Sequence, residues 1–239
     1  MLKDAIWFNR KQWAYTKLGF GFTLAFYATY GGLAGMFSGD WFEEMETFQA
    51  VMTDFVVLAF MSCVGFVFSK GYLNNPYWKN DAFTKRLATL RTHPIPVETL
   101  AMSRSVQLAA VSPLSAAVFF GVFYAVSEWA QSLHPATFLQ FAFVWLAFGN
   151  VCGAWFVLQE WGASGKQYLL RSVYAMLAYV AAGAVLYVTT KKHVTIGLAE
   201  AIDAPGGWVW TLAALAAAVA AHVWMQRRLR RILHRRDFA

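Results

Sequence analysis

Residues 105–127 read SVQLAAVSPLSAAVFFGVFYAVS, and this stretch contains no charged side chain. A bilayer core is about 30 Å thick and takes roughly 20 apolar residues as a helix. A backbone in lipid must also form its hydrogen bonds within the segment, which favours a helix over a strand or loop. The stretch therefore predicts a membrane-spanning helix, and with it an integral membrane protein.

The composition of the whole chain supports this interpretation. Of its 239 residues, 59% are hydrophobic, 18% are aromatic and 14% are charged. In soluble domains about a quarter of the residues are charged. The net charge of +7 could suggest nucleic acid as a partner, but the basic residues lie between apolar runs. We therefore expect membrane lipid around the chain and no nucleic acid partner.

Five further apolar windows flank the first in both directions. Together they predict an all-α, polytopic fold as a single transmembrane domain, with spans at 18–39, 47–69, 105–127, 136–159, 172–190 and 204–226. Residues 1–17 mix large aromatic with basic side chains, which is typical of a helix lying in the membrane interface. The first long apolar run has the length of an anchor, so we expect no cleaved signal peptide.

The loops between these windows differ in charge. Eighteen of the 20 Lys and Arg residues fall on one side of the predicted membrane, and only Lys191 and Lys192 fall on the other. Basic residues near helix ends are retained in the cytoplasm. This predicts that both termini are cytoplasmic.

The largest cytoplasmic segment, 70–104, contains a predicted short helix at 79–91. Asn80 or Asp81 can cap its start, and His93 before Pro94 is disfavoured from continuing it. Its apolar side chains Phe83, Leu87 and Leu90 share one face, and the opposite side presents Lys85, Arg86 and Arg91. The pattern fits docking of a soluble protein, or a helix resting on the inner leaflet. Residues 95–104 then lead into the third span, so a force on the short helix would reach the membrane.

Few polar side chains interrupt the spans. Gln140 and Asn150 in the fourth span could line a substrate path or form hydrogen bonds between helices. Asp54 is the charge placed furthest inside an apolar context, near the outer end of the second span, and an intramembrane carboxylate is a candidate for proton coupling. The pairs Gly31/Gly35 and Gly149/Gly153 have the spacing that permits close helix packing, within one chain or between two.

Motifs for covalent chemistry are not apparent. The five histidines are scattered and the two cysteines lie far apart within apolar stretches, so we expect no metal site and no catalytic residue. Residues 162–167 approach a phosphate-binding loop but lack its first glycine and the Ser or Thr that would hold magnesium. We expect that the chain binds no cofactor directly and is not an enzyme.

The sequence KNDAFTKRLATLRTHPIPVETLAMSR, residues 79–104, resembles the loop after the second helix of bacterial ABC-2-type permeases, the membrane subunits of ABC exporters. In that family a coupling helix ends near a Leu-x-x-x-Pro-Ile stretch and leads into a Ser-Arg pair that opens the third helix. Leu90, Pro94, Ile95, Ser103 and Arg104 fill those places here. The family's coupling helix usually opens with an acidic residue, for which Asp81 is the counterpart.

The resemblance implies a non-catalytic permease subunit in the cytoplasmic membrane. A separate ATP-binding cassette subunit would bind and hydrolyse ATP. It would dock on the predicted short helix at Phe83, Arg86, Leu87, Leu90 and Arg91. A second permease chain, identical or a sister, would complete the path. The alternative is an autonomous membrane protein, either a proton-coupled secondary transporter that uses Asp54 or a membrane assembly factor.

Overall fold

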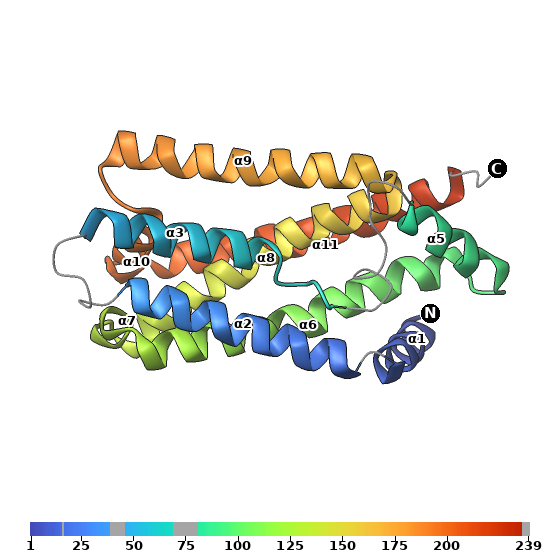
Figure 1. Cartoon of the computed structure of the whole chain (residues 1–239), viewed down its shortest axis with the longest axis horizontal. Coiled ribbons are helices and arrows are strands. Elements are labelled where there is room, and N and C mark those ends of the chain that lie inside the picture. The colour runs from blue at the N-terminus through green and yellow to red at the C-terminus, as the bar shows by residue number, and fades with distance from the viewer. Residues whose placement is uncertain (16, 39–45, 69–80, 236–239) are drawn as a thin grey trace.

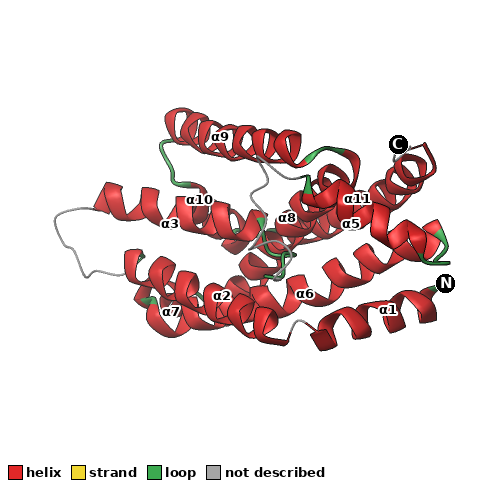
Figure 2. Ribbon diagram, turned by 45° about the vertical axis from the view of Figure 1, so that its right-hand side comes forward, coloured by secondary structure: helices red, strands yellow, loops and turns green. Residues whose placement is uncertain are grey.

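A computed structural model describes residues 1–15, 17–38, 46–68 and 81–235. Those residues form helices and contain no strand (Figure 2). The helices are α1 (Leu2–Tyr15), α2 (Lys17–Phe37), α3 (Glu46–Ser62), α5 (Ala82–Thr92), α6 (Val97–Val126), α7 (Glu128–Ser132), α8 (Pro135–Gly162), α9 (Gly165–Thr190), α10 (Val194–Asp203) and α11 (Trp208–Arg235). The fold is all-α, as the sequence predicts.

The helices α2, α3, α6, α8, α9 and α11 run along the long axis of the molecule (Figure 1). Among the described residues, four helices are long and apolar enough to cross a membrane, namely α6, α8, α9 and α11. One end of the bundle carries α1, α5 and the end of α11, and we call it the α5 end. The other end carries α7 and α10, and we call it the α10 end.

Several helix boundaries differ from those predicted from the sequence. The second predicted span, 47–69, is helical only as far as Ser62, after which the chain passes through a turn. The helix expected at 79–91 lies at Ala82–Thr92, with Asp81 as its N-cap and His93 as its C-cap. The third long helix begins at Val97, directly after Pro96, and continues past Pro113 without a break. Sequence analysis did not foresee α7 or α10, which are short helices between long ones.

Glycines allow the long helices to approach one another closely. A Cβ atom added at Gly31 of α2 would lie 2.3 Å from the backbone oxygen of Phe119 in α6. A Cβ atom at Gly149 of α8 would lie 2.5 Å from the backbone oxygen of Met61 in α3. Both glycines therefore pack helices within one chain, which settles the choice that the sequence left open for them.

Two apolar clusters fill the interior. The larger one joins α2, α3, α6, α8 and α10 around aromatic side chains such as Tyr27, Phe119 and Phe141. The smaller one, at the α5 end, joins α5, α6, α8 and α11 around Leu87, Leu100, Trp161, Met225, Leu229 and Leu233. The α9 helix takes little part in either cluster and lies at the edge of the bundle in both views (Figures 1 and 2).

The contact at Gly31 predicts the effect of a single methyl group. Gly31→Ala should destabilise the chain by about 1–3 kcal/mol, because the added carbon meets backbone that cannot rotate away. Gly121→Ala is the matched control, since nothing lies within 4 Å of a Cβ atom at Gly121. Thermal unfolding in detergent measures both, and the control should be neutral or slightly stabilising. Equal effects of the two substitutions would contradict the close approach.

Candidate functional site

The start of α5 is bound to the start of α9. The Asp81 carboxylate accepts hydrogen bonds from the backbone N–H of Thr84, at 3.0 Å, and from the Thr84 hydroxyl, at 2.6 Å. It also accepts one from the backbone N–H of Gly165, the first residue of α9, at 3.1 Å. A carboxylate is stabilised at a helix N-terminus, where backbone N–H groups lack partners. One side chain therefore caps two helices and holds them together.

The middle of α5 approaches a buried ion pair between α6 and α8. Arg104 Nη2 donates to Glu160 Oε1 at 2.5 Å, and the two side chains are only 7% and 8% exposed. Arg86 Nη1 of α5 lies 4.0 Å from the same carboxylate oxygen. Because buried charges are costly unless they are paired, these contacts constrain the relative positions of the three helices.

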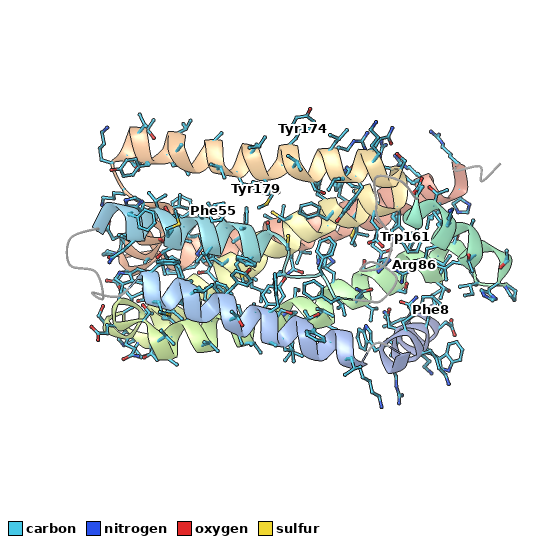
Figure 3. The ribbon with its side chains drawn as sticks, viewed as in Figure 1. Phe8, Phe55, Arg86, Trp161, Tyr174 and Tyr179 are labelled. Atoms are coloured by element: carbon cyan, nitrogen blue, oxygen red, sulfur yellow. The ribbon has the colours of Figure 1, made fainter. Side chains whose placement is uncertain are left out.

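Two further contacts hold the Arg104 guanidinium in place. Its Nη1 donates to Gln107 Oε1 at 2.8 Å, and the group lies 5.0 Å from the centroid of the Trp161 ring. Figure 3 shows Trp161 and Arg86 near each other at the α5 end. Sequence analysis overlooked Glu160 as a functional candidate. The available signal was an acidic residue directly after an apolar window, on the side of the predicted membrane where most charges are basic.

The predicted docking residues of α5 do not share one exposed surface. Leu87 is 3% exposed and packs in the smaller apolar cluster, and Leu90 packs against the same cluster. Burying a leucine contributes about 1.5–3 kcal/mol, which explains why this face turns towards the bundle. Lys85, Thr89 and Thr92 are exposed. The side chains of Phe83 and Arg91 lie outside the described part of the chain, as do residues 69–80 of the same loop.

Gln140 and Asn150 both contact side chains on neighbouring helices. Asn150 Oδ1 accepts from the Ser112 hydroxyl of α6 at 3.1 Å and lies 3.0 Å from His222 Nε2 of α11. Gln140 Oε1 lies 3.5 Å from the Thr211 hydroxyl of α11. Such bonds between membrane helices hold neighbours in register. In this conformation the two side chains link α8 to α6 and α11.

Asp54 of α3 caps α10. Its carboxylate accepts from the backbone N–H groups of Val194 and Thr195, both at 2.8 Å, and from the Thr195 hydroxyl at 2.6 Å. His193 Nδ1 lies 3.6 Å away. A carboxylate at a helix N-terminus supplies acceptors to backbone N–H groups that have none within the helix. The geometry thus gives Asp54 a structural task.

A cavity of about 230 Å³ lies between α3 and α9, beside Asp54. It is lined by Val51, Asp54, Phe55, Leu58, Ala59, Met176, Tyr179, Val180, Gly183, Ala184, Tyr187 and His193. Figure 3 shows Tyr179 between α9 and the bundle, whereas Tyr174 points away from it. Sites for drug-sized ligands occupy about 300–1,000 Å³, so this cavity suits a slimmer apolar group. No sequence pattern could indicate it, because its two walls come from distant segments.

Comparison with known proteins assigns no family to the chain. No protein-family model, curated protein or solved structure matches the chain. We call the contacts of Asp81, Arg86, Arg104 and Glu160 described above the α5 junction. Its geometry is the basis for assigning it a role.

The buried ion pair predicts a strong effect at Glu160. Glu160→Gln should lower the free energy of unfolding by roughly 3 kcal/mol or more, because it leaves the buried Arg104 charge without its counter-charge. Adding Arg104→Gln should recover part of that loss. Thermal or denaturant unfolding in detergent is the measurement.

Glu200→Gln is the control for Glu160→Gln. Glu200 pairs with Lys192 at an exposed site, and such pairs contribute under about 1 kcal/mol. If both substitutions had the same small effect, the Arg104–Glu160 pair would not hold α6 and α8 together.

Asp54→Ala should loosen α10. The substitution leaves two backbone N–H groups without an acceptor, which costs about 1–2 kcal/mol. Hydrogen exchange at Val194 and Thr195 should accelerate correspondingly. Asp54→Asn keeps one acceptor oxygen in place of two, so it should restore the protection of only one of the two N–H groups. Unchanged exchange in the alanine variant would show that Asp54 does not cap α10.

Proposed function

We propose that the chain is the transmembrane permease subunit of an ATP-driven exporter of the ABC-2 type. The observation that carries this proposal is the α5 junction. A short helix outside the four candidate spans is bound to the start of α9 through Asp81 and approaches the Arg104–Glu160 pair through Arg86. A displacement of α5 would act directly on α6, α8 and α9, which is what a transmission element requires.

The proposal includes a division of labour between two subunits. A separate subunit binds and hydrolyses ATP and pushes on α5, and this chain converts the push into movement of its spans. Burial of Leu87 supports the proposal, because a helix that transmits force must be anchored to what it moves. The docking surface then includes the exposed Lys85 and Thr89 and the half-exposed Arg86, with Leu87 and Leu90 serving as the anchor.

The proposed topology has six spans. To the four long apolar helices we add α2, of 21 residues, and α3, of 17 residues, which run parallel to them (Figure 1). With six spans both termini lie in the cytoplasm, at the α5 end, and α1 lies in the membrane interface. Two such chains would form the path, and the weakly packed α9 supports a further contact there.

Asp54 bears on the alternative of a proton-coupled carrier. Its carboxylate is engaged by three hydrogen bonds that fasten α10, and a residue that must release and take up protons in each cycle would disrupt that cap. The geometry thus favours the permease over a carrier driven through Asp54.

Purification from native membranes in mild detergent tests the proposal. A P-loop ATPase should accompany the chain in equal amount by quantitative mass spectrometry. The double variant Lys85→Glu/Thr89→Glu should reduce that amount about tenfold, because charge reversal at an interface weakens association. A chain that comes alone and intact would overturn the permease assignment.

The matched control is Lys191→Glu/Thr189→Glu, which makes the same changes at exposed positions of the α10 end. It should retain the ATPase. Asp81→Ala is the companion variant for coupling, since it removes the link to Gly165 and leaves Lys85 and Thr89 unchanged. It should retain the ATPase but lose transport.

A further inference from the structure

The end of α11 carries four arginines on one face. Arg227, Arg228, Arg231 and Arg235 are all exposed, and at 3.6 residues per turn they fall within about 100° of the helix circumference. We call them the arginine stripe. Within the described part of the chain, none of these four side chains has an ion-pair partner. Their charge is therefore available to a ligand outside the bundle.

The opposite face of the same segment is locked into the bundle. Met225, Leu229 and Leu233 are fully buried and pack in the smaller apolar cluster with Leu87 and Trp161. This packing fixes the rotation of α11 about its axis. The arginine stripe is consequently held in one direction, and a ligand need not order the backbone when it binds.

The depth of the stripe follows from the tryptophans of α11. Trp210 and Trp224 are 57% and 51% exposed and lie on the same face as the stripe. They are separated by about 21 Å along the helix axis, at a rise of 1.5 Å per residue. This is less than the thickness of a hydrocarbon core, about 30 Å, so these two tryptophans do not both mark its edges. From Trp208, the first residue of α11, to Arg227 the helix rises about 28 Å, which places an interface close to Arg227.

The stripe then occupies the next layer outward. From Arg227 to Arg235 the helix rises about 12 Å. The headgroup region on each side of a bilayer is about 5–8 Å thick, by the difference between total and hydrocarbon thickness. The first arginines thus lie at headgroup depth and the last one just beyond. The exposed face of α11 continues into the stripe without a change of direction, so a lipid that packs on the apolar part of this face can reach the arginines with its headgroup.

We propose that the arginine stripe binds the phosphate groups of anionic phospholipids in the leaflet at the α5 end. A guanidinium group is always charged and donates two parallel hydrogen bonds to one phosphate, which a lysine ammonium does not do. Basic clusters directly beside a membrane helix attract anionic lipid in this way. At the same end of the bundle, α1 carries exposed Leu2, Ile6 and Trp7 together with Lys3 and Arg10, which suits the surface of the same leaflet. The proposal does not depend on transport or on an ATPase.

Native mass spectrometry of the full chain in a neutral detergent tests the proposal, with phosphatidylglycerol or phosphatidylcholine added. The wild-type chain should retain phosphatidylglycerol in preference to phosphatidylcholine. The variant Arg227→Gln/Arg228→Gln/Arg231→Gln/Arg235→Gln should retain at most about one fifth as much phosphatidylglycerol as the wild type. Replacing the same four residues by Lys should give an intermediate loss, since charge remains and paired hydrogen bonding does not.

The control removes four positive charges elsewhere, as Lys85→Gln/Lys166→Gln/Lys191→Gln/Lys192→Gln, all at exposed positions. It should retain phosphatidylglycerol like the wild type. Thermal unfolding without added lipid should show that both quadruple variants are folded, because neither changes a buried side chain. Equal retention by the two quadruple variants would overturn the proposal, and so would displacement of the lipid by inorganic phosphate in modest excess.

Discussion

In a helix that crosses lipid, the backbone N–H and C=O groups form hydrogen bonds with one another. They are therefore not available to bind a neighbouring helix. Everything that fastens one long helix of this protein to the next must come from side chains or from close backbone approach. Gly31 and Gly149 provide the close approach in the middle of the bundle. Carboxylates provide much of the fastening near its ends, where unpaired backbone N–H groups and arginines are within reach.

Three carboxylates fasten helices near the ends of the bundle. Asp81 joins the starts of α5 and α9, Glu160 joins α8 to α6, and Asp54 joins α3 to the start of α10. Two of them lie on either side of α9, because α10 directly follows that helix. Along its length, by contrast, the most apolar 18-residue stretch of α9 contains no buried residue. The helix is thus fixed at its ends and weakly packed between them, an arrangement that suits a part of the bundle that moves relative to the rest.

The two ends of the bundle differ in what they offer to partners. At the α5 end, one apolar cluster supports both α5 and the last turns of α11. The proposed ATPase contact on α5 and the proposed lipid contact on the arginine stripe would therefore both act on this cluster. At the α10 end, the short helices α7 and α10 cover the bundle, and the cavity beside Asp54 opens between α3 and α9.

The sequence by itself determined the long helices and α5, because their signals are local. Charge-free windows, a cap at Asp81 and the stop before Pro94 depend only on neighbouring residues, and they indicated the all-α class and the place of α5 to within a few residues. The tertiary structure alone decided which side of α5 is buried, which arginine meets Glu160 and which helix Asp54 caps. Arg104 and Glu160 are 56 positions apart, and Asp54 and Val194 are 140 apart. No local spacing encodes such pairs, since they arise only when packing brings distant helix ends together.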